Sequence, residues 1–288
     1  MENIKFTKMS GAGNDFIVFE KSDLNKIGLS SKIISKLCDR RNGIGADGVI
    51  VINKSNSIDF EMLYYNADGS TGSLCANGAR CAIKYSVNAG WNSDDVIKFH
   101  SNGKEYSGKF INDGNIIFHL NPPSKIKYNF KVKAFNQLIN ANYADTGSPH
   151  VILKVNDILT EPDNPNSYFS DIDLIPVEKI GREIRMLAEF SPHGVNVNFL
   201  QKKEKTVNLR TYERGVESET YACGTGAVAA AIIVYVTEKL MPPIEIKVKS
   251  NQKLFVNFDV KDNRVTNVTL TGPAELVYSG SIPLSIFE

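Results

Sequence analysis

The segment after Cys223, residues 224–236, reads GTGAVAAAIIVYV and constrains the fold more than any other part of the chain. If it is helical, apolar side chains occupy nearly every face of the helix. A helix that is apolar all round must be buried all round. Because the chain offers few other helices, strands must surround this one. We therefore expect a sheet curled around a central helix.

Most of the remaining chain alternates or runs apolar between Gly, Asn, Asp and Pro turns, which is typical of short β-strands. The predicted strands are residues 4–9, 16–20, 48–52, 60–66, 96–100, 115–120, 150–155, 195–200, 205–213, 244–250, 253–258 and 264–270. Helical periodicity is confined to residues 30–40, the segment after Cys75, residues 176–190 and the segment after Cys223. Many strands with few helices predict an α+β fold rather than a regular βαβ array.

The order of these elements repeats in the two halves of the chain. Each half has a Gly-rich turn beside a strand, then a helix, a second turn and strand, and a helix that begins near a cysteine. The cysteine segments align as C-A-N-G-A at Cys75 and C-G-T-G-A at Cys223, 148 positions apart. Chance similarity among β-rich segments is the alternative. The repeat predicts two similar domains related by a pseudo-twofold axis, with a boundary near the Pro-rich residues 120–129.

Composition excludes several classes of protein. The 288 residues are 42% hydrophobic and 23% charged, as in a soluble globular protein, and the net charge of +1 gives no overall attraction to nucleic acid or an anionic membrane. The N-terminus lacks the features of a signal peptide. The longest apolar run, residues 227–236, is much shorter than the roughly 20 residues of a membrane helix. We therefore expect a cytoplasmic protein with no nucleic-acid or membrane partner.

The four cysteines are too few for a disulfide scaffold, and none lies in a Cys-x-x-Cys pair. The four histidines are scattered, so a zinc site is not expected. Cys38 lies within an ordinary amphipathic helix, and Cys81 has no Gly-rich loop of its own. Both are predicted to be core residues.

Cys75 and Cys223 differ, because each lies in a Gly-rich turn at the start of a predicted helix. A helix N-terminus carries unpaired N–H groups and about half a positive charge, which lowers the pKa of a thiol and favours carboxylate binding. Two such thiols suit the inversion of a carbon stereocentre: one removes a proton from one face and the other returns a proton to the opposite face. The sequence thus favours a two-base racemase or epimerase that acts on an amino acid.

Further polar residues fit this chemistry. Glu213 could hold an ammonium group and Arg214 could clamp a carboxylate through two hydrogen bonds, although an adjacent acid and guanidinium can also form a simple surface ion pair. Four asparagines lie at turns beside strands or helices, where asparagine is also common for backbone reasons; these are Asn14, Asn66, Asn77 and Asn196.

Six motifs resemble those of the diaminopimelate epimerase family, in the family's order and across nearly the whole chain. They are SGAGNDF at 10–16, GIGADG at 43–48, NADGS and CANGARC within 66–81, TGSPH at 146–150, GVNVNF at 194–199 and ERGVESETYACGTG at 213–226. The resemblance implies the interconversion of LL- and meso-diaminopimelate in lysine and peptidoglycan synthesis, with no pyridoxal phosphate, no metal and no other cofactor. It also implies two pseudo-symmetric domains, each a β-barrel-like sheet around a central helix. Diaminopimelate is the expected small-molecule partner. A homodimer is considered, but the sequence does not determine the oligomeric state.

Carried over residue by residue, the resemblance makes Cys75 and Cys223 the catalytic pair. Glu213 would bind the reacting ammonium, and His150 would support the pair. The backbone N–H groups expected to hold the reacting α-carboxylate are those of Ala76, Asn77, Gly224 and Thr225. The residues expected to fix the distal end of the substrate are Arg214, Asn66 and Asn196, and Asn14 would line the pocket.

Three positions depart from patterns common in that family. Ala76 follows the first catalytic cysteine where glycine is frequent, Ser148 stands where some members have asparagine, and Gly48 stands where some have glutamine. Residues 272–288 resemble the family's C-terminal return to the first domain. The expected domains are therefore residues 1–122 plus 272–288, carrying Cys75, and residues 123–271, carrying Cys223.

Other classes of function compete with this interpretation. A Cys/His hydrolase would pair Cys75 or Cys223 with His150 as base, but would leave the second cysteine without a role. A related isomerase could act on another amino acid, or on a phenazine-type intermediate, although the phenazine-type relative lacks the cysteine pair. A nucleotide-binding module would use the Gly-rich segments, but these complete neither G-x-G-x-x-G within a βαβ unit nor a P-loop.

Overall fold

The structure, a computed structural model, describes residues 3–24, 28–72, 74–92, 95–111, 114–283 and 285. Of the C-terminal segment singled out above, residues 284 and 286–288 lie outside the described residues. The chain forms two compact units, one of Met1–His119 with Thr271–Glu288 and one of Leu120–Leu270. None of the helices in the described ranges is long and apolar enough to cross a bilayer.

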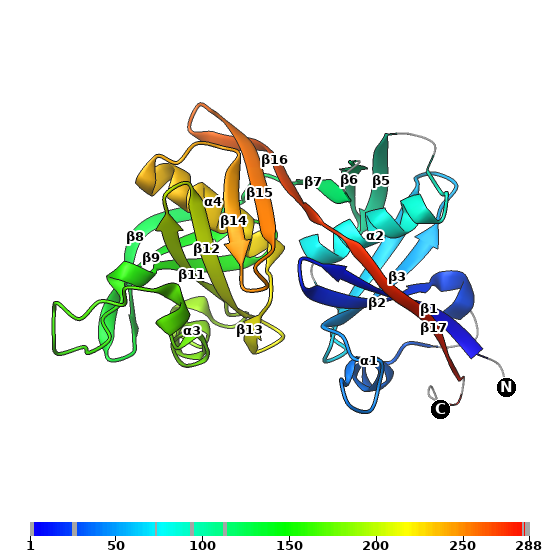
Figure 1. The fold of residues 1–288 in the computed structure, drawn as a ribbon, viewed down its shortest axis with the longest axis horizontal. Helices are drawn as coiled ribbons and strands as arrows, with labels where there is room; N and C mark the ends of the chain where they lie inside the picture. The colour runs from blue at the N-terminus through cyan, green and yellow to red at the C-terminus, as the bar shows by residue number, and fades with distance from the viewer. Residues whose placement is uncertain are drawn as a thin grey trace. The chain divides into compact units, whose positions relative to one another are not determined.

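The first unit is built mainly of strands (Figure 1). Its strands are β1 (Asn3–Gly11), β2 (Asn14–Glu20), β3 (Gly48–Lys54), β4 (Phe60–Asn66), β5 (Val96–Ser101), β6 (Lys104–Phe110), most of β7 (Asn115–Leu120) and β17 (Glu275–Pro283). Its helices are α1 (Ser31–Cys38) and α2 (Ala76–Asn88), with a short 3₁₀ helix at Lys21–Leu24.

The second unit has the same mixture of elements. Its strands are β8 (Lys125–Ala134), β9 (Gln137–Asp145), β10 (Pro149–Lys154), β11 (Asn196–Lys203), β12 (Thr206–Glu213), β13 (Ser218–Thr220), β14 (Ile244–Val248), β15 (Lys253–Lys261) and most of β16 (Arg264–Pro273). Its helices are α3 (Val177–Arg185) and α4 (Gly224–Glu238), with 3₁₀ turns at Val155–Asp157, Ile172–Leu174 and Ala188–Phe190.

The two units repeat one order of strand pairing. In the first, β2 pairs in parallel with β3, β3 pairs antiparallel with β4, and β4 pairs in parallel with β5. In the second, β10, β11, β12 and β14 pair in the same three ways. Along the chain, α1 and α3 come between the two strands of the first parallel pair of their units. The helices α2 and α4 come between the two strands of the second parallel pair. The predicted repeat is therefore confirmed in the topology.

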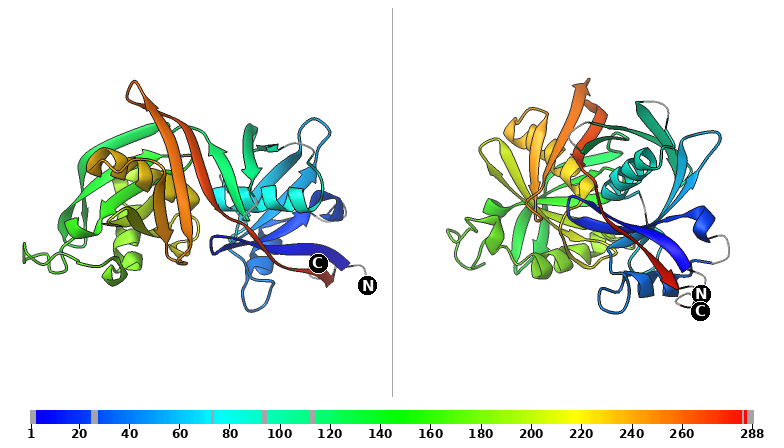
Figure 2. Two further views of the ribbon diagram at one scale, coloured as in Figure 1. Left: turned by 45° about the horizontal axis from the view of Figure 1, so that its top comes forward. Right: turned by 45° about the vertical axis from the view of Figure 1, so that its right-hand side comes forward.

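The helix α4 is enclosed, as its composition predicts. Residues Gly224–Val234 are all buried, and the helix contacts β9, β10, β11, β12, β14 and β15. In the first unit α2 is buried over Ala76–Ile83 and contacts β1, β2, β3, β4, β6 and β17. Each helix lies among the strands of its own unit (Figures 1 and 2). The expected α+β fold, with a sheet wrapped around a central helix in each unit, is confirmed.

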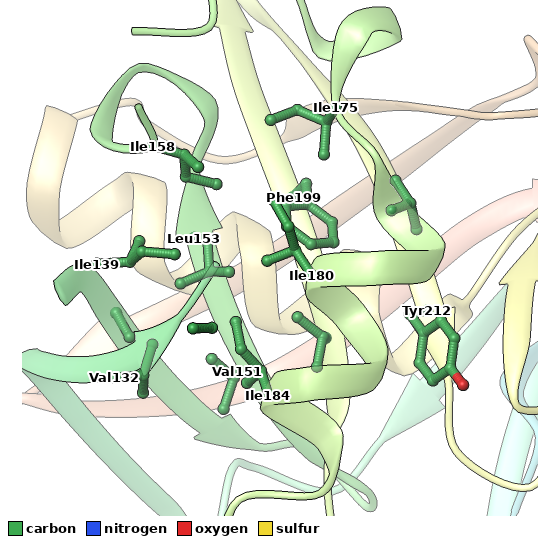
Figure 3. Packing of buried hydrophobic residues seen from close by; sticks show 14 of the residues in the cluster. Val132, Ile139, Val151, Leu153, Ile158, Ile175, Ile180, Ile184, Phe199 and Tyr212 are labelled. Atoms are coloured by element: carbon green, nitrogen blue, oxygen red, sulfur yellow. The ribbon is translucent and has the colours of Figure 1, made fainter. Parts of the chain in front are cut away.

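The helix α3 packs against strands of the second unit (Figure 3). Ile180 and Ile184 are fully buried and belong to one apolar cluster with Phe199 of β11 and Tyr212 of β12. At Gly181 the helix backbone approaches β12 so closely that a Cβ atom would lie 2.5 Å from the Cβ of Tyr212. Only glycine permits this approach, because a packed core has no spare volume for a methyl group.

The structure contains strands that the apolar pattern does not predict, namely β6, β8, β9, β13 and β17. β8 and β17 are largely exposed, so their sequences show little of the alternation that marks a half-buried strand. The helix predicted over residues 176–190 ends at Arg185. Leu187 is extended, and with Phe190 it packs against the apolar cluster instead of continuing the helix.

We expect Gly181→Ala to destabilise the protein by about 1–3 kcal/mol, the usual cost of overpacking a filled core. The new methyl group would have to displace Tyr212, which outweighs the better helix propensity of alanine. Gly28→Ala is the matched control, because no atom lies within 4 Å of a Cβ there. Urea unfolding of both variants measures the difference. Equal stability of Gly181→Ala and the wild type would contradict the packing described for α3 and β12.

Candidate functional site

Cys75 is the N-cap residue of α2, with an extended backbone (φ −93°, ψ 113°). Its Sγ accepts a hydrogen bond from the N–H of Gly78 at 3.4 Å, so the sulfur occupies the place of the oxygen that usually caps a helix. Ala76 and Asn77 form the start of the helix and are buried. N–H groups of a first turn have no acceptor within the helix, which makes this turn suited to an anion.

The amide of Asn14 lies next to the Cys75 sulfur. Asn14 is buried, and its Oδ1 accepts from Cys75 Sγ at 3.6 Å and from Asn77 Nδ2 at 3.2 Å. Its Nδ2 donates to Asp47 Oδ2 at 2.6 Å. The structure therefore brings together three of the residues named from the sequence, Asn14, Cys75 and Asn77, and adds Asp47 to them.

Asn66 closes β4, and its Nδ2 donates to Ser70 Oγ at 2.9 Å, which holds the side chain in the turn after that strand. Gly48, at the start of β3, has no room for a side chain: a Cβ there would lie 2.6 Å from the ring of Tyr64 and 2.6 Å from the carbonyl oxygen of Tyr65. The neighbouring Tyr64 thus accounts for glycine at this position.

Cys223 is the N-cap residue of α4 and is extended in the same way (φ −121°, ψ 110°). Its Sγ lies 3.7 Å from Thr225 Oγ1, within hydrogen-bond distance for sulfur. At Gly226 a Cβ would lie 3.3 Å from the Cys223 sulfur and 2.5 Å from Asn198 Oδ1. Glycine is required there because the helix start packs directly against the thiol and this buried amide.

A directed chain of hydrogen bonds ends at Thr225. Asn198 Nδ2 donates to the Val151 carbonyl at 3.1 Å, and Asn198 Oδ1 accepts from Thr211 Oγ1 at 2.9 Å, so the orientation of this amide is fixed. His150 Nδ1, 3.0 Å from Asn198 Nδ2, must then be an acceptor. In the neutral imidazole the proton is consequently on Nε2, which donates to Thr225 Oγ1 at 2.9 Å.

His150 is fully buried, and burial lowers the pKa of its imidazole to about 3, with a smaller contribution from the positive charge of Arg214. The ring is therefore neutral at physiological pH. It contacts Thr225, whose hydroxyl keeps its own proton for an acceptor such as the Cys223 sulfur. His150 is thus arranged to orient Thr225.

Glu213, Arg214 and Asn196 meet at one end of β11 and β12. Asn196 Oδ1 accepts from the backbone N–H of Arg214 at 2.8 Å, and Asn196 Nδ2 donates to the Pro149 carbonyl at 3.2 Å. Glu213 Oε2 accepts from Thr220 Oγ1 at 2.8 Å. Glu213 and Arg214 are both half-buried. The structure therefore places these three predicted residues together.

A cavity of about 580 Å³ lies beside Arg214 in the second unit. Charged and polar groups in its lining include Lys125, Lys127, Tyr143, Asp145, His193 and Arg214. It presents positive and negative side chains together, as a ligand that carries both an ammonium and a carboxylate group would require. The sequence does not identify this cavity, because its residues come from segments far apart in the chain.

The two remaining cysteines are core residues, as predicted. Cys38 and Cys81 are buried, at 5% and 0% exposure. Burial raises the pKa of the Cys38 thiol to about 12 and that of Cys81 further still. Both are therefore protonated and unreactive at neutral pH. Among the described residues, no group of three or more His, Cys, Asp and Glu side chains is arranged to hold a metal ion.

Several residues that support the site are missed by sequence reasoning. They are Asp47, Arg80, Asn198 and Thr211, of which Arg80 donates from Nη2 to Asn77 Oδ1 at 2.9 Å. The first three lie within the GIGADG, CANGARC and GVNVNF motifs, and this is the signal that could have found them. Their partners are mostly distant in sequence, so spacing alone does not reveal the contacts.

Comparison with known proteins gives a consistent family. A family model described as diaminopimelate epimerase matches residues 6–126 and 142–277. The protein named diaminopimelate epimerase in Chlorobaculum tepidum is 37% identical over 279 residues, which covers 96% of this chain and 100% of that protein. The protein of the same name in Aquifex aeolicus is 34% identical over 298 residues, covering 99% of this chain and 100% of that protein.

Solved structures with the same fold are more distant in sequence. A Bacillus anthracis phenazine biosynthesis protein of the PhzF family has a TM-score of 0.72 at 14% identity, covering 99% of this chain and 100% of that one. A hydroxyproline epimerase from Agrobacterium vitis has a TM-score of 0.68 at 13% identity, covering 98% and 93%. At these identities the likeness concerns the fold alone.

The burial of His150 predicts a pH dependence of stability. In the unfolded chain a histidine takes up a proton as the pH falls below about 6.5, whereas in the folded protein His150 takes up none until about pH 3. Between these values the unfolded state binds more protons. The free energy of unfolding therefore decreases as the pH is lowered, by up to about 1.4 kcal/mol per pH unit. His150→Gln should lose this contribution. Urea unfolding of both proteins between pH 6.5 and pH 5 tests it, and equal slopes would contradict a buried, neutral imidazole.

Proposed function

The chain belongs to the diaminopimelate epimerase family, and on this premise we propose that it interconverts LL- and meso-diaminopimelate by a two-base mechanism. Cys75 and Cys223 are the proposed acid and base. The observation that carries the proposal is that these two cysteines each occupy the N-cap position of a buried central helix. Cys38 is the last residue of α1 and Cys81 lies in the middle of α2, so neither is at the start of a helix.

In the proposed reaction, one cysteine as thiolate removes the α-proton from one face of the substrate carbon. The other cysteine, as thiol, delivers its proton to the opposite face. The two residues exchange roles in the reverse direction, so no net proton is gained or lost. The mechanism requires both sulfurs to reach opposite faces of one α-carbon. It requires neither pyridoxal phosphate nor a metal, because the two thiols supply both the proton acceptor and the proton donor.

The α-proton of an amino acid is weakly acidic, so the negative charge that develops after its removal must be stabilised. The first-turn N–H groups of α2 and α4 are suited to this task, since they would hold the α-carboxylate toward which the charge is delocalised. On α2 these groups belong to Ala76 and Asn77, and on α4 to Gly224 and Thr225. The positive ends of both helix dipoles add to the effect.

Groups around β11 and β12, together with Asn66 at the end of β4, would recognise the rest of the substrate. Glu213 is the proposed ligand of the reacting ammonium. Arg214, with Asn196 and Asn66, is proposed to bind the distal end. The mixed charges of the cavity beside Arg214 support a ligand whose distal end also carries an ammonium and a carboxylate. The roles in lysine and peptidoglycan synthesis, a cytoplasmic location and a homodimer belong to the same proposal.

The properties of His150 argue against a Cys/His hydrolase. A hydrolase of that class needs a histidine that accepts a proton from the nucleophile near neutral pH. Here burial lowers the pKa of His150 to about 3, and Nε2 is a donor to Thr225. A neutral imidazole that so strongly resists protonation is a poor general base.

We expect Cys75→Ser and Cys223→Ser each to reduce kcat for epimerisation by about 10²–10⁴-fold, because a hydroxyl is a far weaker acid than a thiol. Cys81→Ala is the matched control: Cys81 lies in the same helix as Cys75 but is a core residue, so kcat should stay within about twofold. Chiral chromatography of LL- and meso-diaminopimelate, with protein dialysed against a chelator, measures the rates. Wild-type activity in either serine variant would refute the two-base mechanism.

A further inference from the structure

Asp47 lies in the turn before β3 and has no role in the reaction proposed above. Its Oδ1 accepts from Arg40 Nη2 at 2.7 Å. Its Oδ2 accepts from Asn14 Nδ2 at 2.6 Å and from the backbone N–H of Asp15 at 3.2 Å. Both oxygens are therefore used, one by a cation and one by an amide that is hydrogen-bonded to Cys75.

Asp47 is part of a cluster with two cations and two carboxylates. Asp15 pairs with Lys8 at 2.7 Å and with Arg40 through both carboxylate oxygens, at 2.7 and 3.0 Å. Burial acts to raise the pKa of Asp15, but hydrogen bonds from Arg40 and Lys8 lower it overall. Burial and the nearby negative charge of Asp15 raise the pKa of Asp47. The four charges balance, which allows Lys8, Asp15 and Asp47 to be mostly buried while Arg40 remains exposed.

Arg80 lies at the other end of the same chain of contacts. It is fully buried in α2, and its Nη2 donates to Asn77 Oδ1 at 2.9 Å. Its other donors reach the carbonyl oxygens of Ala76 and Pro273, and none of the described carboxylates forms an ion pair with it. Burial lowers the pKa of Arg80 to about 10, so the guanidinium is still charged at neutral pH.

These contacts form a one-way series of hydrogen bonds. A guanidinium can only donate, so Arg80 fixes the oxygen of Asn77 toward itself. The NH₂ group of Asn77 then faces Asn14 and donates to its Oδ1. An ionised carboxylate can only accept, so Asp47 fixes the NH₂ group of Asn14 toward itself. Each amide is thus held in one orientation by a charged group at one end of the series.

We propose that Asp47 and Arg80 are positioning residues that keep the carbonyl oxygen of the Asn14 amide facing the Cys75 sulfur. This inference rests on the proposed function, because its importance depends on Cys75 being an acid and base. A carbonyl oxygen accepts the S–H proton and disfavours the thiolate. The reverse orientation would place NH₂ against the sulfur and favour the thiolate. The orientation of one amide therefore sets how readily Cys75 gives up its proton.

Asp47→Asn tests the orientation directly. The new amide has one oxygen in place of two, whereas Asp47 accepts from Arg40, from Asn14 and from the backbone N–H of Asp15. Where the new NH₂ group faces Asn14, it competes with the NH₂ group of Asn77 for the single oxygen of Asn14. Asn14 is then no longer held in one orientation, and after turning over its Nδ2 donates to Cys75.

Asp15→Asn is the matched control for charge. Asp15 belongs to the same cluster and shares Arg40, so the substitution removes the same negative charge. It leaves the Asp47 carboxylate on Asn14 unchanged. A purely structural or purely electrostatic role for Asp47 predicts similar effects of both substitutions.

The measurement is the rate of iodoacetamide alkylation of Cys75 as a function of pH, read by peptide mass spectrometry on the full chain. Asp47→Asn should increase Cys75 alkylation about tenfold at pH 7, as expected if the pH midpoint for the thiolate falls by about one unit. Asp15→Asn should change it by no more than about twofold. Alkylation of Cys223, in the same sample, should be unchanged in both. An equal increase in both variants, or no increase in Asp47→Asn, would overturn the proposal.

A second variant and an independent assay complete the test. If Asp47→Asn does not give wild-type circular dichroism and thermal unfolding, Asn14→Leu replaces it, because leucine is similar in size and removes the acceptor. Unchanged Cys75 alkylation in Asn14→Leu would also overturn the proposal. Alkylation requires no substrate, so it is independent of the epimerase assay. A protein without epimerase activity in which the Asp47→Asn shift occurs would refute the proposed function but leave the positioning role in place.

Discussion

The burial of the N-terminal turns of α2 and α4 on all sides is the constraint on which the rest of the structure depends. Each helix is surrounded by strands of its own unit, so it cannot tilt or slide without opening a packed core. Each begins at a cysteine, Cys75 or Cys223. A rigid helix therefore fixes both the position of a thiol and that of the first-turn N–H groups beside it. Preorganisation of this kind is what acid–base chemistry at a weakly acidic carbon requires.

The side chains that support the two cysteines differ, although the helices are alike. At Cys75 the neighbouring side chain is an acceptor, the carbonyl oxygen of Asn14. At Cys223 the neighbouring group is the hydroxyl of Thr225, which already accepts from His150 and so has its own proton to offer. A two-base enzyme must start each turnover with one thiol and one thiolate. Unequal surroundings for the two sulfurs are consistent with that requirement.

Much of the fold follows from the sequence, and the reason is visible in particular residues. The apolar run from Ala227 to Val236 permits no exposed helix face. The matched Gly-rich turns at Cys75 and Cys223 indicate where two helices begin. Exposed strands such as β8 carry no comparable signal, because a lysine-rich sequence is compatible with either a strand or a loop. The supporting contacts of the site are invisible for another reason. Asn14, Asp47 and Arg80 are 33 or more positions apart in sequence, and only the folded chain shows that their polar groups meet.

The central claim, that two thiols serve one α-carbon from opposite faces, is tested most directly by the fate of the proton. LL-diaminopimelate is incubated with the protein in deuterated water, and product and recovered substrate are analysed at low conversion by mass spectrometry and NMR. With separate bases, the meso product carries one solvent deuterium at the inverted carbon from the first turnover, while recovered substrate carries none. Product that retains the substrate's own proton would show a single base acting on both faces, and would contradict the account.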